Sequence, residues 1–124
     1  RIEQGTPPLI LGDGSTSMDF IYIEDLARAN VLALKSDASD EVFNVASGVE
    51  TNLNGLAASL MQVMGADPAM VPEYGPERSV NPVARRLADT SKAERMLGFK
   101  AEVDLEEGLR RLVTWWRANK DMFE

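Results

Sequence analysis

The chain has 124 residues, 44% of them apolar and 27% charged, which is enough for one small domain with a buried core. Its 13 Lys and Arg and 20 Asp and Glu give a net charge of −7, so its average field would repel nucleic acids and anionic membranes. The lack of Cys excludes disulfides and thiolate chemistry, and the lack of His removes the commonest metal ligand. No apolar run approaches the roughly 20 residues of a membrane-spanning helix. These features predict a cytoplasmic protein with no nucleic-acid or membrane partner.

The first half of the chain predicts short strands around one helix. After a helix-compatible start at 1–4, the pattern predicts a strand at 9–11, a turn at 12–17, a strand at 19–23, a helix from 24 to about 36 and a strand at 41–46. The strand segments are short runs of apolar and β-branched residues. The helical segment has apolar residues that recur every three or four positions.

The second half predicts three helices. One is capped by Thr51 and stops at Gly65, a short one follows Asp89 or Thr90 and stops at Gly98, and the last begins after Asp104. Between the first two, the proline-rich stretch 66–82 predicts a loop with a short strand near 70–71. The chain is therefore predicted to form one mixed α+β domain over residues 1–124, with three to four helices and short strands.

A glycine pair and an acidic cluster are the first candidates for chemistry. Gly12-Asp-Gly14 has neither spacing of the known phosphate-binding loops, so a turn between two strands is the favoured interpretation. Carboxylates gather nearby in the sequence, at Asp13, Asp19, Glu24 and Asp25. They favour capping and other structural roles over acid–base catalysis, and the ligand spacing of an EF-hand is absent.

Three arginines lie within nine residues of a proline-rich loop, at Arg78, Arg85 and Arg86. The planar guanidinium fork grips phosphate through two hydrogen bonds, and loops are where ligand contacts concentrate. The alternative is that these side chains form solvated ion pairs with the acidic residues close to them in the sequence.

Six segments carry a resemblance to a known family: 8–14 (PLILGDG), 19–29 (DFIYIEDLARA), 41–48 (EVFNVASG), 88–93 (ADTSKA), 97–99 (LGF) and 105–109 (LEEGL). Their order and approximate spacing resemble the C-terminal part of the NAD-dependent nucleotide-sugar epimerases and dehydratases, in the extended short-chain dehydrogenase/reductase family. The UDP-glucose 4-epimerase-like proteins are the most similar group. The resemblance covers essentially the whole chain.

The resemblance implies a substrate site for a nucleotide sugar, with a UDP-sugar as the expected partner. The family's strand that matches 9–11 runs beside the nucleotide base, which implies substrate contacts for Leu9 and Ile10. Met18 stands where the family has an Arg that grips the diphosphate, so one charged contact is replaced by a thioether. A lost charge-assisted bond of this kind costs about 1.5–3 kcal/mol unless it is compensated.

The arginine cluster contains the implied compensation. Arg78 matches a second diphosphate-binding Arg of the family, although this chain has about one extra residue between it and the segment 88–93. Arg85 or Arg86 is the candidate to replace the charge that is missing at Met18. The resemblance therefore implies six substrate-binding residues: Leu9, Ile10, Met18, Arg78, Arg85 and Arg86.

Two catalytic features of the family are not found in the sequence. There is no glycine-rich dinucleotide loop, and no Tyr-x-x-x-Lys, since Leu26 stands four residues after Tyr22 and Arg78 four residues after Tyr74. We therefore expect NAD to serve the whole enzyme, no cofactor to bind to this chain, and no redox catalysis by the chain alone. The start at Arg1 rather than Met suggests the last third of a longer enzyme whose Rossmann half lies upstream.

The sequence leaves two other functions open. The chain would be a binding or assembly module without catalysis if its strand at 43–45, which the resemblance places in a Rossmann sheet, exposed an edge and formed a homo-oligomer. An unrelated carboxylate hydrolase is the weaker alternative, because the acidic cluster is its only support.

Overall fold

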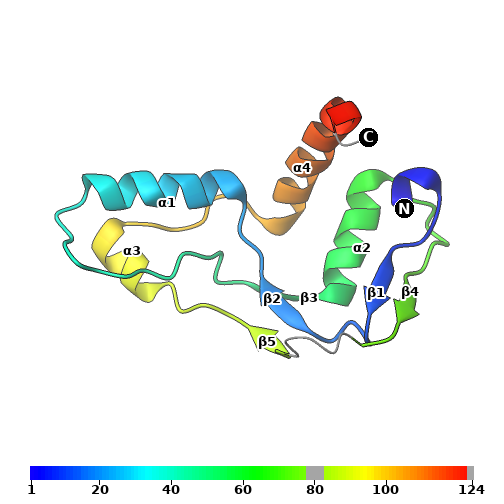
Figure 1. The fold of residues 1–124 in the computed structure, drawn as a ribbon, viewed down its shortest axis with the longest axis horizontal. Coiled ribbons are helices and arrows are strands. Elements are labelled where there is room, and N and C mark those ends of the chain that lie inside the picture. Colours follow the sequence, from blue (N-terminus) through cyan, green and yellow to red (C-terminus); the bar gives the residue numbers. More distant parts are fainter. Residues whose placement is uncertain (78–82, 123–124) are drawn as a thin grey trace.

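The computed structural model of the chain describes residues 1–77 and 83–122 (Figure 1). The helices of this part are α1 (Ile23–Lys35), α2 (Leu53–Met64), α3 (Ser91–Leu97) and α4 (Leu105–Asn119), with short 3₁₀ turns η1 (Ile2–Gln4) and η2 (Lys120–Met122). The strands are β1 (Leu9–Leu11), β2 (Ser17–Asp19), β3 (Glu50–Asn52), β4 (Glu73–Gly75) and β5 (Arg85–Arg86). The predicted α+β class, with helices and short strands, is confirmed. Within the described ranges, no helix is long and apolar enough to cross a membrane.

Local capping sets the start of α4 and both ends of α2. The side chain of Asp104 accepts a hydrogen bond from the Glu107 N–H at 2.8 Å, so α4 begins where the sequence predicts. Asn52 rather than Thr51 caps α2, because its Oδ1 accepts from the Gly55 N–H at 2.7 Å. The helix then ends at Gly65, whose φ of 69° is a left-handed conformation that suits glycine.

The strands form two small sheets. In the first, β1 runs parallel to β4, with Ile10 opposite Tyr74. In the second, β2 lies between an antiparallel β3 and a parallel β5, and Met18 stands opposite Arg86. Each strand has only two or three residues, so the sheets mainly join segments that are distant in the sequence.

The strand predicted at residues 41–46 does not occur in either described sheet, so that prediction is wrong for this structure. Its side chains still alternate, since Phe43 and Val45 pack on the core while Val42 is 82% exposed. A strand needs a hydrogen-bonded neighbour, and the segment has none in the described part of the chain. Instead, Lys92 holds the Val42 carbonyl at 2.9 Å.

Two other predicted strands lie at different positions along the chain from those predicted. The second strand lies at 17–19 rather than 19–23, because β2 pairs with β3 and the helix already begins at Ile23. The short strand expected near 70–71 lies at 73–75, where it can pair with β1. The two-residue β5 falls in a stretch for which the sequence predicts no strand.

Buried side chains gather at the two ends of the molecule. At one end, where α1 lies beside α3 (Figure 1), the buried cluster consists of Ala29, Ala93, Leu97 and Phe99, and Phe99 is only 1% exposed. At the other end, α2 packs against α4, and the buried residues there are Ile10, Ala57, Leu109 and Val113. The three-stranded sheet connects the two ends.

Asp25 is the main buried charge of the structure, with 3% exposure. Its carboxylate accepts hydrogen bonds from the Glu102 N–H at 3.0 Å and the Val103 N–H at 2.9 Å, and it pairs with Arg28 at 2.8 Å. These contacts tie the start of α1 to the loop that leads into α4. Burial alone would raise the pKa of Asp25, but the Arg28 bond and the two amide bonds outweigh it and lower the pKa.

Candidate functional site

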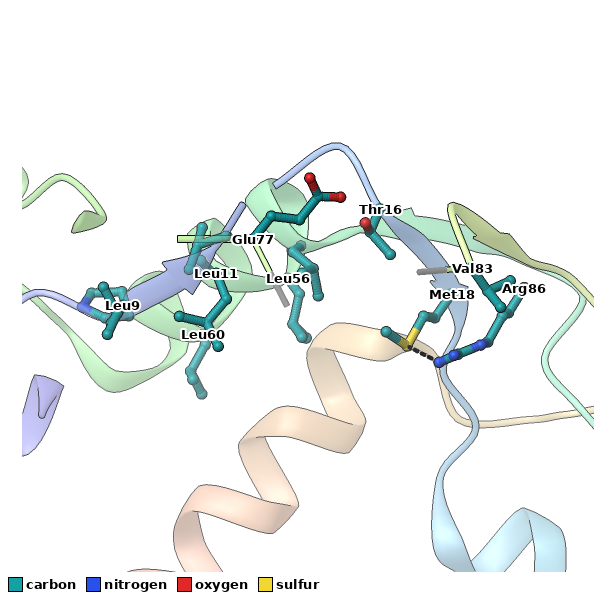
Figure 2. A pocket seen from close by; sticks show the side chains of 13 residues that line it. Leu9, Leu11, Thr16, Met18, Leu56, Leu60, Glu77, Val83 and Arg86 are labelled. Atoms are coloured by element: carbon teal, nitrogen blue, oxygen red, sulfur yellow. Dashed lines mark hydrogen bonds between the residues drawn. The ribbon is translucent and has the colours of Figure 1, made fainter. Parts of the chain in front are cut away.

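An apolar pocket of about 550 Å³ lies between the two small sheets and α2. β1 and α2 together supply the apolar side of the pocket, whose residues are Leu9, Ile10, Leu11, Leu53, Leu56, Ala57 and Leu60. Among the described lining residues, those with polar side chains are Thr16, Glu77 and Arg86. Figure 2 shows Leu9, Leu11, Leu56 and Leu60 on one side of the space and the Met18–Arg86 pair on the other. A cavity of this size with few polar groups is typical of a small-molecule site.

Arg86 is the one cation among the described residues that line the pocket. Its Nη1 lies 4.0 Å from Met18 Sδ (Figure 2), and no described carboxylate forms an ion pair with it. A guanidinium without an anionic partner at the end of an apolar pocket is suited to receive an anionic ligand group.

Arg85 lies on the opposite face of the sheet from Arg86. Successive side chains of a strand point to opposite faces, so two adjacent arginines on β5 cannot share one site. The Arg85 guanidinium pairs with Glu50 at 2.8 Å. The hydrogen bond from Arg85 lowers the pKa of Glu50, and the hydrogen bond from the Ser17 hydroxyl lowers it further. The bond to Glu50 in turn raises the pKa of Arg85.

The structure thus separates the six predicted substrate-binding residues into three groups. Leu9, Ile10, Met18 and Arg86 line one pocket. Arg85 forms the solvated ion pair that the sequence left open as the alternative for these arginines, although its partner is Glu50. Arg78 lies outside the described residues.

Sequence reasoning missed the α2 wall of the pocket. Leu53, Leu56 and Leu60 recur at helical spacing, a pattern that predicts a face buried in a core. In the structure this face is only partly buried, because the pocket opens over it. No signal in the sequence distinguishes a helix face that packs on protein from one that lines a cavity.

The glycine turn makes room for the chain's own side chains. A Cβ added to Gly14 would lie 2.2 Å from Asn54 Oδ1, and Glu77 is the nearest neighbour of a Cβ added to Gly12. The Asn54 amide also donates to the Asp13 carbonyl at 3.1 Å. The favoured interpretation as a turn is therefore confirmed. This turn does not fit the pyrophosphate of NAD, because the Asn54 side chain already occupies the close approach that Gly14 allows.

The acidic cluster has structural roles in the described chain. Asp13 accepts from Ser15, Asp19 accepts from the Ser47 and Gly48 N–H groups, and Asp25 ties two loops as described above. No group of three or more acidic residues in the described ranges is placed to hold a metal ion. These three carboxylates thus have the structural contacts that the sequence favours, but the expected capping of the 24–36 helix is wrong, because no side chain caps the start of α1 and Asp25 accepts from Glu102 and Val103 instead.

Comparison with known proteins relates this geometry to a family. The family model described as GDP-mannose 4,6 dehydratase matches residues 1–112. A putative UDP-glucose 4-epimerase of Methanocaldococcus jannaschii is 38% identical over 112 residues, which are 90% of this chain and 35% of that protein. A UDP-glucose 4-epimerase of Mycolicibacterium smegmatis is 32% identical, over 91% of this chain and 35% of that protein.

Solved structures show the same likeness. The UDP-glucose 4-epimerase of Thermotoga maritima, solved with UDP-glucose, superposes with a TM-score of 0.88 and 36% identity, covering 97% of this chain and 38% of that one. A UDP-N-acetylglucosamine 4-epimerase of Methanobrevibacter ruminantium, solved with UDP-N-acetylmuramic acid, gives a TM-score of 0.85 and 36% identity, covering 95% of this chain and 37% of that one. The chain spans little more than a third of the length of these relatives. It belongs to the family of NAD-dependent nucleotide-sugar epimerases and dehydratases.

Proposed function

We propose that this chain is the C-terminal, substrate-binding part of an NAD-dependent nucleotide-sugar epimerase or dehydratase, and that its pocket holds the nucleoside diphosphate of a UDP-sugar. One observation carries the proposal: an apolar cavity of about 550 Å³ ends at Arg86, with which no described carboxylate forms an ion pair. Two relatives that were solved with UDP-sugars share the fold of this chain over nearly its whole length, which supports the choice of ligand.

The walls of the pocket suit the two halves of a nucleoside diphosphate. β1 offers Leu9 and Ile10, with the backbone of a short strand, beside the expected place of the base. Arg86 stands across the cavity, where its planar fork can bind phosphate oxygens through two hydrogen bonds. Met18 contributes apolar contact beside it, so the charge of the site comes from β5 rather than from β2.

The hydride-transfer chemistry is proposed to belong to another part of the enzyme. In this family NAD accepts a hydride from the sugar, while a tyrosine of the Tyr-x-x-x-Lys motif removes the hydroxyl proton. The sequence of this chain contains neither that motif nor a glycine-rich dinucleotide loop. We therefore expect the isolated chain to bind a nucleotide sugar without turning it over.

Calorimetric titration of the 124-residue chain with UDP and with uridine tests the proposal. UDP should bind with one site per chain and at least about tenfold more tightly than uridine, because a charge-assisted phosphate contact is worth about 1.5–3 kcal/mol. An NAD-linked turnover assay with a UDP-sugar should show no product. If UDP binds no more tightly than uridine, the proposal that the pocket holds a nucleoside diphosphate is wrong.

A second candidate function, self-association without catalysis, is favoured by one surface. The segment 41–46 has no strand neighbour in the described chain, and its Val42 side chain is 82% exposed. Backbone that lacks a strand neighbour, next to exposed apolar side chains, favours pairing with another copy. The chain alone is then expected to sediment as a dimer at high concentration, and a monomer at all concentrations would remove this candidate.

A further inference from the structure

Three strands contribute one residue each to a polar cluster on the face of the sheet opposite Arg86. Glu50 comes from β3, Ser17 from β2 and Arg85 from β5. Arg85 Nε donates to both Glu50 oxygens, at 3.0 and 2.9 Å, and Ser17 Oγ donates to Glu50 Oε1 at 2.5 Å. Glu50, on β3, thus accepts hydrogen bonds from both the central strand β2 and the outer strand β5. We call this cluster the Glu50 clamp.

The clamp matters because little else fixes β5. This strand has two residues, and among the described residues one backbone hydrogen bond beyond its ladder leads into it, from the Ser17 N–H to the Ala84 carbonyl at 3.0 Å. A solvated ion pair usually contributes little, but a two-pronged arginine–carboxylate pair that joins a network is the exception. The Glu50 clamp therefore has a large share in setting the position and rotation of β5.

The rotation of β5 decides where Arg86 points. Because adjacent side chains of a strand lie on opposite faces, holding Arg85 against Glu50 turns Arg86 toward the pocket. If Arg85 were released, the two-residue strand could twist or leave β2, and Arg86 would lose its place opposite Met18.

We propose that Glu50 is a positioning residue for nucleotide binding, which acts through Arg85 to aim Arg86 at the ligand's phosphates. This inference rests on the proposed function, because it assumes that Arg86 binds the phosphates of the nucleotide. Glu50 itself does not line the pocket and would not touch the ligand.

The test is a double-mutant cycle on the whole 124-residue chain, with UDP as the ligand in calorimetric titrations. E50A should lower the affinity for UDP by about threefold or more in the wild-type background and have no further effect in the R86Q background. E50Q keeps an oxygen that can accept from Arg85, so it should restore part of the affinity that E50A loses. The melting temperature and circular dichroism of each variant show whether it is folded, and E50Q serves as the cycle's single mutant if E50A is not.

The outcomes separate the two proposals. If the wild-type chain does not bind UDP, the proposed function is wrong and the role of Glu50 is wrong with it. If the wild-type chain binds UDP and the Glu50 substitution lowers affinity equally in both backgrounds, or in neither, the clamp does not act through Arg86 and only this inference is overturned. A loss that depends on Arg86, with partial rescue by E50Q, supports it.

Discussion

Arg86→Gln is expected to weaken the binding of UDP by about tenfold or more, because it removes a charge-assisted phosphate contact worth about 1.5–3 kcal/mol. Arg86 is the pocket's only cation among the described residues, and glutamine keeps much of its length without its charge. Binding of uridine should change little, since uridine has no phosphate. Calorimetric titration of both ligands against the variant measures the two effects separately.

Arg110→Gln is the matched control for Arg86→Gln. It removes the same charge from an exposed position on α4, where Arg110 pairs with Glu106, and Arg110 does not line the pocket. Its UDP affinity should stay within about twofold of the wild type, because exposed charges at a distance are screened by salt. Equal losses in the two variants would mean that UDP senses overall charge rather than a site at Arg86.

Asp25→Ala should lower the free energy of unfolding by about 1–3 kcal/mol for each partly buried N–H group that loses its acceptor. The substitution leaves the Glu102 and Val103 N–H groups without their acceptor and Arg28 without its buried partner. Asp25→Asn keeps one acceptor oxygen and should lose less. Denaturant unfolding followed by circular dichroism measures both changes.

Asp13→Ala is the control, because Asp13 also accepts two hydrogen bonds, from Ser15, but does so at an exposed turn. Its effect on the free energy of unfolding should be much smaller than that of Asp25→Ala. Similar effects at the two positions would contradict the role given to burial.

The same carboxylate predicts a dependence of stability on pH. The pKa of Asp25 is lowered in the folded chain from 3.8, so its ionised form stabilises the fold at higher pH. That contribution is lost as the pH falls below 3.8 and through the lower pKa of the folded state. The difference in unfolding free energy between wild type and Asp25→Asn should therefore shrink with acid, and a constant difference would contradict the lowered pKa.

The helices were predictable from the sequence because their signals are local. Asp104 caps α4 through an N–H three residues away, and Gly65 ends α2 by its own conformation. Strand pairing is not local. β5 pairs with β2 across more than sixty residues of sequence, and nothing in its two arginines predicts a strand. The segment 41–46 shows the opposite case, a strand-like pattern without a neighbour to pair with in the described chain.

The candidate site was predictable only in part for the same reason. Leu9, Ile10 and Met18 followed from the family resemblance, and the structure places them around one pocket. The choice between Arg85 and Arg86 needed the register of β5, because adjacent residues of a strand face opposite ways. Asp25 was expected to have a structural role, but its partners at 102 and 103 lie far along the chain and gave no local signal.

The most direct test of the proposed nucleotide site is an NMR titration of the ¹⁵N-labelled chain with UDP, which both detects the ligand and locates it. We expect the amide shifts to change around β1, β2, α2 and β5, which surround the pocket, and to stay nearly constant in α1 and α3, which lie at the other end of the molecule. Shifts concentrated on α1 and α3, or the absence of any change at saturating UDP, would contradict the claim that this pocket binds the nucleoside diphosphate.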